Sequence, residues 1–261
     1  MNVLDFQTCK GTRKISMVTC YDYWSARILE KTDIDCLLVG DSLAMVMHGY
    51  DSTVFAEIEL MALHVRAVAK GAPDKFIVGD MPFLSTRKGL QPTMDAVQML
   101  MQAGANAVKV EGEAGQRELI AHIVESGVPV MGHLGLTPQS VNGFGGHKVQ
   151  GRKDVDAEAL FASALGVAEA GCFALVLECV PASLAQRISQ AIDIPTIGIG
   201  AGPHTDGQVL VLHDMLGMNP EFTPKFLRRY GDGYSLVSNA VNRFHAETVQ
   251  GCFPSQAESY G

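Results

Sequence analysis

Three features are missing from this sequence: a long apolar run, a pair of closely spaced cysteines, and a cluster of basic residues. No apolar stretch approaches the about 18 residues of a membrane-spanning helix, and the start, MNVLDFQTCKGTRK, lacks the apolar core of a signal peptide. The six cysteines, at positions 9, 20, 36, 172, 179 and 252, form no CxxC pair, which favours reduced core residues over a disulfide or a zinc site. We therefore expect a soluble, cytoplasmic protein.

The charge and the composition exclude further classes. The chain carries a formal net charge of −8, which argues against nucleic acid or an anionic membrane as the partner. Lys225, Arg228 and Arg229 come closest to a basic patch, and we expect them on a solvated helix face. No linker or charge block interrupts the 261 residues, 47% of which are hydrophobic. We expect one domain over residues 1–261, with a short flexible C-terminal tail.

Short apolar runs alternate with helical patterns along the chain. Eight such runs are typical of a closed (β/α)8 barrel, whereas an open doubly wound sheet usually has about five or six parallel strands. The expected strands are 15–20, 35–40, 75–79, 107–110, 128–134, 174–180, 195–200 and 208–213. In a barrel of this kind, the side chains that do chemistry lie at the carboxyl ends of the strands.

Three successive runs deliver an acidic residue where the run ends. CLLVGDS ends at Asp41, FIVGD at Asp80 and AVKVEG at Glu111. On adjacent strands these carboxylates would lie within a few ångströms of one another and would repel unless a cation lay between them. An all-oxygen donor set points to a hard ion, Mg²⁺ or Mn²⁺, rather than zinc. The alternative is that the acids pair with Lys or Arg at the barrel mouth.

Three further polar residues lie on the same expected strands. Lys109 alternates with Glu111, so both side chains point into the barrel; a lysine there binds an anion or forms a Schiff base, and a neighbouring acid favours the first role. His133 is either a hydrogen-bond donor of the core or part of the site. Glu178, in the apolar run LVLECV, must take a raised pKa or reach solvent, and a raised pKa suits a general base.

A metal, a cationic anchor and a separate carboxylate base suit one type of reaction. An α-keto acid would chelate the metal, with Lys109 near its carboxylate. The base would then take a proton from the carbon next to the keto group and give a metal-stabilised enolate, which attacks an electrophile. The residues indicate enolate carbon–carbon bond chemistry and leave the electrophile open.

Several ordered blocks carry a resemblance to a known family. The runs VGDSLAMVMHGYDST, VGDMPF, AVKVEG, GHLGLTPQSVNGFGG, KVQGR, LVLECVP and IPTIGIGAGPHTDGQVLVLHDMLG resemble the signature blocks of the ketopantoate hydroxymethyltransferase family. The similarity extends from about Ile15 to Tyr230. It implies a TIM barrel of the phosphoenolpyruvate/pyruvate-type group that assembles as a homo-oligomer, usually a decamer.

The resemblance also implies a reaction and its residues. The family transfers a hydroxymethyl group from 5,10-methylenetetrahydrofolate to 3-methyl-2-oxobutanoate, giving 2-dehydropantoate and tetrahydrofolate in pantothenate biosynthesis, with one Mg²⁺ per subunit. Its metal ligands fall on Asp41, Asp80 and Glu111, the last commonly through water. Its substrate contacts fall on Asp41, Ser42, Asp80 and Lys109, His133 matches a position near the substrate, and the proton acceptor falls on Glu178.

Two other functions stay open from the sequence. One is a lyase or mutase of the phosphoenolpyruvate/pyruvate group, which shares the metal and the keto acid but uses no folate. Such enzymes often use a reactive loop cysteine, and Cys179 follows the expected base but alternates to the opposite face. The other is a non-catalytic relative that binds a keto acid for regulation, which predicts loss of the base, whereas Glu178 is present.

Overall fold

Eight parallel strands close into one barrel in the computed structural model, which describes all 261 residues. The strands follow one another in chain order, and β8 pairs with β1 to complete the ring. This confirms the expected (β/α)8 fold. The strands are β1 Ile15–Thr19, β2 Cys36–Val39, β3 Phe76–Asp80, β4 Ala107–Glu111, β5 Val130–Gly135, β6 Ala174–Glu178, β7 Thr196–Ile199 and β8 Gly207–Leu210.

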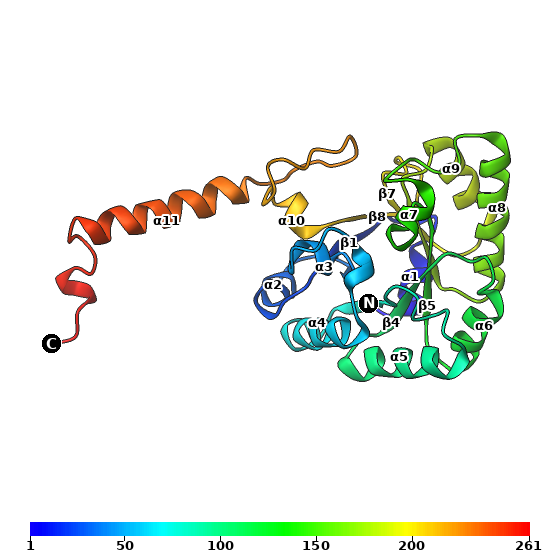
Figure 1. Cartoon of the computed structure of the whole chain (residues 1–261), viewed down its shortest axis with the longest axis horizontal. Helices are drawn as coiled ribbons and strands as arrows, with labels where there is room; N and C mark the ends of the chain where they lie inside the picture. Colours follow the sequence, from blue (N-terminus) through cyan, green and yellow to red (C-terminus); the bar gives the residue numbers. More distant parts are fainter. The chain divides into compact units, whose positions relative to one another are not determined.

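Helices connect the strands and cover the outside of the barrel (Figure 1). Their apolar faces pack on the strands because each helix has a stripe of buried residues, such as Met61, Val65 and Val68 of α4. The helices that follow the strands around the barrel are α2 Tyr23–Leu29, α4 Ile58–Gly71, α5 Leu90–Ala103, α6 Arg117–Glu125, α8 Asp154–Glu169 and α9 Ala182–Ala191. Short helices lie in the connections: α3 Leu43–Val46, η1 Thr53–Phe55, η2 Pro138–Ser140 and α7 Val141–Phe144.

A helix that the sequence patterns did not reveal, α1 (Val3–Cys9), packs at the base of the barrel. Asn2 caps it, and Asp5 completes a capping box. Its Phe6 is fully buried, with the ring centroid 5.8 Å from that of Phe76 and 5.4 Å from that of Phe173. Because those two aromatic residues stand at the starts of β3 and β6, α1 covers the amino-terminal end of the barrel.

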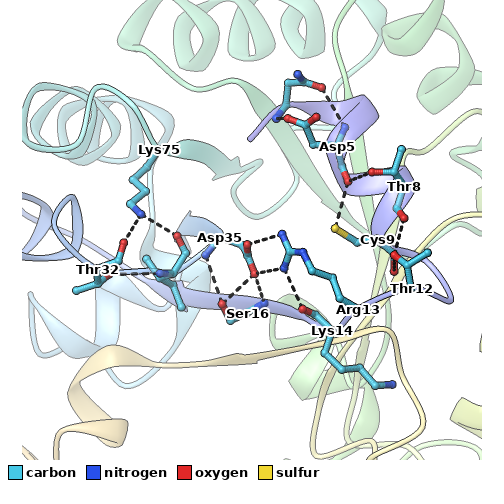
Figure 2. A network of polar contacts seen from close by, with 12 residues as sticks. Asp5, Thr8, Cys9, Thr12, Arg13, Lys14, Ser16, Thr32, Asp35 and Lys75 are labelled. Atoms are coloured by element: carbon cyan, nitrogen blue, oxygen red, sulfur yellow. Dashed lines mark hydrogen bonds and ion pairs between the residues drawn. The ribbon is translucent and has the colours of Figure 1, made fainter.

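A polar network joins the first three strands at the same end (Figure 2). Asp35 accepts two hydrogen bonds from Arg13, at 2.8 and 3.0 Å, and two from the backbone N and the hydroxyl of Ser16. Lys75, directly before β3, donates to the carbonyl oxygens of Thr32 and Ile34. These contacts form no nucleophile–base pair or other catalytic group. Because the amino-terminal end of such barrels typically contributes to stability, we assign the network a structural role.

Apolar side chains fill the barrel interior above α1. They belong to one buried cluster to which all eight strands contribute: Met17, Cys36, Leu38, Val78, Ala107, Met131, Val176, Ile197 and Val209. Alternate residues of each strand face inward, so the interior is a packed core that continues up to the carboxyl ends of the strands. The polar residues described below lie on top of this core.

Residues Val211–Gly261 form a second compact unit, apart from the unit Met1–Leu210 that contains the barrel. The second unit holds α10 (Leu212–Met215), α11 (Gly233–Val249) and a short 3-10 helix, Gln256–Glu258. The prediction of one domain over 1–261 stays a prediction. None of the chain's helices combines the length and the apolar character that a membrane crossing requires.

Candidate active site

The register of the sheet brings the expected site residues together. Asp80 of β3 pairs with Lys109 of β4, and Glu111 pairs with His133 of β5. One strand further, Glu178 ends β6. All these residues share the inward face, because each strand places every second side chain there. The expectation that the acids of neighbouring strands meet at one end of the barrel is met by the structure.

Lys109 lies at the centre of this group and is almost fully buried. Its Nζ atom is 3.2 Å from Oδ1 of Asp80, 3.8 Å from Oε1 of Glu111 and 3.0 Å from Nδ1 of His133. Burial lowers the pKa of Lys109, but the carboxylates of Asp80, Glu111 and Asp41 outweigh burial and raise it above its usual value. The amine is therefore an ammonium at neutral pH, which disfavours Schiff-base chemistry and suits anion binding.

Nearby positive charge offsets burial and mutual repulsion to different degrees at the three carboxyl groups. Burial and the charges of Glu111 and Asp80 raise the pKa of Asp41 well above its usual range. Burial also raises the pKa of Asp80 against the opposing effect of Lys109. Burial opposes ionisation of Glu111 as well, but His133 and Lys109 outweigh it and lower the pKa of that carboxyl. Asp41 is thus the acid with the least compensation.

His133 connects the lysine to the outermost acid. Its Nε2 lies 3.3 Å from Oε2 of Glu178, and its Nδ1 is 3.4 Å from Oε1 of Glu111. Burial and the charge of Lys109 lower the pKa of His133, Glu111 and Glu178 raise it, and the balance lies at about 9. Nε2 carries a proton in the imidazolium and also in the neutral tautomer that accepts from Lys109 at Nδ1. In both states Glu178, whose side chain is 19% exposed, faces a donor.

Two contacts around Asp41 and Ser42 could not be read from the sequence. The side-chain nitrogen of Gln139, in η2, donates to Oδ2 of Asp41 at 2.8 Å. The hydroxyl of Tyr21, directly after β1, lies 2.8 Å from that of Ser42. Both Gln139 and Tyr21 lie in connections between strands, and the sequence patterns assigned neither residue a role. The only indication of a role for Gln139 was its position in the block GHLGLTPQSV.

The donor set fits a hard divalent cation. Asp80 Oδ1 and Glu111 Oε1 are buried without a hydrogen bond, and three acids face one lysine, so oxygen ligands and negative charge are available. As the side chains stand, no three His, Cys, Asp or Glu side chains converge on a common point, and Asp80 and Glu111 contact Lys109 instead. The ion pairing that the sequence left as an alternative is therefore present for these two acids.

The cysteines show no feature of a reactive site. All six are free, and Cys9, Cys20, Cys36 and Cys172 are buried. Burial, together with the charge of Glu178, raises the pKa of Cys179 to about 11. Because the thiolate is the nucleophile, Cys179 is poorly suited to the role of a reactive loop cysteine.

Solved structures with the same architecture support the fold. The fold matches a phosphoenolpyruvate phosphomutase from Streptomyces platensis subsp. rosaceus (TM-score 0.64, 11% identity, covering 96% of this chain and 88% of that chain). It also matches 2,3-dimethylmalate lyase, a member of the PEP mutase/isocitrate lyase superfamily (TM-score 0.62, 13% identity, 99% and 91%). The protein therefore shares the (β/α)8 barrel fold of these structures and carries an acidic centre at the barrel mouth.

Sequence relatives narrow this class to one family. Residues 1–256 match the family model of ketopantoate hydroxymethyltransferase. Proteins named 3-methyl-2-oxobutanoate hydroxymethyltransferase are 56% identical in Coxiella burnetii strain CbuG_Q212 (97% of this chain, 96% of the relative) and 56% identical in Bdellovibrio bacteriovorus (99% and 98%). The chain belongs to the ketopantoate hydroxymethyltransferase family. The resemblance seen in the sequence blocks is confirmed, and with it the transferase class.

Proposed function

We infer that this chain transfers a hydroxymethyl group from 5,10-methylenetetrahydrofolate to 3-methyl-2-oxobutanoate. The products are 2-dehydropantoate and tetrahydrofolate, and the step belongs to pantothenate biosynthesis. Family membership over nearly the whole chain supports the reaction. The observation that carries its assignment to this site is the buried ammonium of Lys109, 3.0 Å from His133, whose other ring nitrogen faces Glu178 at 3.3 Å.

Lys109 would bind the acidic end of the keto acid. The ammonium has carboxylates beside it, so it attracts an anion only if part of their negative charge is neutralised. The raised pKa of Asp41 and Asp80 agrees with this requirement, because it favours protonation or cation binding at these two acids. Ser42, half-buried beside Tyr21, can donate to a substrate oxygen from the end of β2. These two residues would fix the orientation of the keto acid at the barrel mouth.

Glu178 is the proposed proton acceptor. It lies at the end of β6, partly exposed, and His133 orients its carboxylate from below. Glu178 takes the proton from C3 of the keto acid, and the electron pair of that C–H bond forms the enolate. The enolate carbon then bonds to the one-carbon unit of the folate, and both bonds from that unit to nitrogen, N5 and N10, break. One water is consumed: its hydroxyl becomes the product hydroxyl, and its remaining proton and the proton taken from C3 go to the two nitrogens, which gives tetrahydrofolate.

Asp41, Asp80 and Glu111 are the proposed holders of one Mg²⁺ per subunit. When bound, this ion supplies the positive charge that stabilises negative charge on the keto oxygen. A phosphonopyruvate hydrolase with the same fold has been described in complex with oxalate and Mg²⁺ (TM-score 0.63, 10% identity, covering 99% of this chain and 93% of that chain). Its fold, and the all-oxygen donors of this chain, support the proposal.

A product assay tests the function. The purified protein is incubated with 3-methyl-2-oxobutanoate, methylenetetrahydrofolate and Mg²⁺, and the products are identified by mass spectrometry. We expect 2-dehydropantoate and tetrahydrofolate in equal amounts. Cleavage or rearrangement of the keto acid without folate would support a lyase or mutase, and no turnover with retained keto-acid binding would support a non-catalytic relative.

The assembly and the location are also proposals. The family resemblance implies a homo-oligomer, usually of ten subunits, and six free cysteines agree with a cytoplasmic location. Light scattering after size exclusion measures the assembly, with a ten-fold multiple of the 28.0 kDa chain expected. A monomer at micromolar concentration would contradict it.

A further inference from the structure

Gln139 contacts two of the three acids at the barrel mouth from a single position. Its side-chain nitrogen donates to Asp41 at 2.8 Å, and its backbone nitrogen donates to Oε2 of Glu111 at 3.1 Å. Asp41 follows β2 and Glu111 ends β4, so this loop residue links strands that are not neighbours in the sheet.

The side chain of Gln139 is itself fixed. The same nitrogen that binds Asp41 also donates to the backbone carbonyl of Met81 at 2.9 Å. Both partners are acceptors, so the NH₂ end of the amide, with its two hydrogens, must face them. The element around it, η2, contacts η1, the short helix Thr53–Phe55 in the connection after β2. A donor held this way presents Asp41 in one orientation.

The contacts extend from Gln139 to the lysine. Asp41 accepts from Gln139 through Oδ2, and its backbone nitrogen donates to Oδ2 of Asp80 at 3.1 Å. The other oxygen of Asp80 contacts Lys109 at 3.2 Å. A donor that holds one oxygen of a carboxylate leaves the other oxygen to bind a cation, and partners of this kind typically change metal affinity about 10–100-fold when removed.

We propose that Gln139 is a positioning residue that orients Asp41 for the divalent cation and so for the keto acid. This inference rests on the proposed function. The backbone bond to Glu111 persists in any substitution, whereas the side-chain bonds do not. A variant at this position therefore separates the orientation of Asp41 from the placement of the loop.

Gln139→Met tests the proposal because it keeps the length of the side chain and removes its donor. The matched control is Gln91→Met on α5, where an exposed glutamine donates to Asp95 at 2.8 Å. Mn²⁺ is titrated into each metal-free protein and free Mn²⁺ is followed by electron paramagnetic resonance. We expect Gln139→Met to weaken Mn²⁺ binding about 10–100-fold, and Gln91→Met to bind as the wild type does.

Two further measurements keep the outcome unambiguous. The melting temperature of each metal-free variant shows whether the fold persists; if Gln139→Met unfolds, Gln139→Asn, which keeps the amide but cannot reach both Asp41 and Met81, replaces it. Wild-type Mn²⁺ affinity in a folded Gln139 variant overturns the proposal. If the wild-type protein itself binds no Mn²⁺ and does not exchange the C3 hydrogen of the keto acid, the proposed function fails instead.

Discussion

His133 and Glu178 face each other across neighbouring strands, with Nε2 of the ring 3.3 Å from Oε2 of the carboxylate. The opposite side of the same ring is 3.0 Å from the ammonium of Lys109. The imidazole therefore separates the proposed anion-binding group from the proposed base. It keeps Glu178 away from Lys109, with which a direct ion pair would reduce its basicity.

Glu178→Gln should remove proton transfer and leave cation binding intact. The amide keeps the size of the side chain but accepts no proton, and loss of a general base typically costs about 10²–10⁴-fold in rate. The measurement is the folate-independent exchange of the C3 hydrogen of 3-methyl-2-oxobutanoate in D₂O, followed by NMR with Mg²⁺ present. Exchange at the wild-type rate would exclude Glu178 as the base.

Mg²⁺ binding should release protons. Burial and neighbouring carboxylates raise the pKa of Asp41, so the metal-free protein holds a proton there at a higher pH than an ordinary aspartate does. A bound cation reverses the repulsion, lowers the pKa and expels the proton. Calorimetric titration in buffers of different ionisation enthalpy measures this release, which should increase as the pH falls and should be smaller in Asp41→Asn, where the raised pKa of Asp80 still contributes. Release that is unchanged in Asp41→Asn would contradict the assignment.

Lys109 should form no covalent adduct with the keto acid. Its pKa is raised by Asp80, Glu111 and Asp41, and a protonated amine does not attack a carbonyl. Treatment of the protein with 3-methyl-2-oxobutanoate and sodium borohydride, followed by intact-mass measurement, should show the unmodified mass. A reduced adduct located on Lys109 by peptide mapping would instead establish the Schiff-base role.

Asp35→Ala should destabilise the base of the barrel without affecting turnover. The carboxylate accepts four hydrogen bonds from Arg13 and Ser16, and their loss should cost about 1–2 kcal/mol, with only a small part from the exposed arginine. Urea unfolding measures the change. Glu158→Ala is the control, because it removes another arginine-paired carboxylate, on an exposed surface, and should barely move the midpoint.

The same variant carries a pH dependence. Burial raises the pKa of Asp35, but the contacts with Arg13 and Ser16 outweigh burial and lower it. A lowered pKa stabilises the fold above the pKa of the unfolded state and loses this effect as the pH falls through the folded-state value. The difference in stability between the wild type and Asp35→Ala should therefore shrink below about pH 4. A difference that is constant from pH 7 to pH 3 would contradict this origin.

The sequence predicted the parts of the molecule that repeat. Eight apolar runs define eight strands, and the position of Asp80, Lys109 and Glu111 within them determines which face they share, because the period of a strand is two residues. Gln139 and Tyr21 were beyond such reasoning, since a loop has no period and its contacts depend on the closed barrel. The helix α1 was missed for a related reason: seven residues give too short a pattern, and Phe6 is explained only by partners far along the chain.

The contacts of Phe6 also have a consequence for biosynthesis. The ribosome makes α1 before the strands, but Phe76 follows only after two strands and Phe173 only after five, more than half a chain later. Phe6 of α1 therefore lacks one of its two aromatic partners until the start of the sixth strand has been synthesised. The newly made chain therefore cannot complete the floor of its barrel until most of its length has left the exit tunnel.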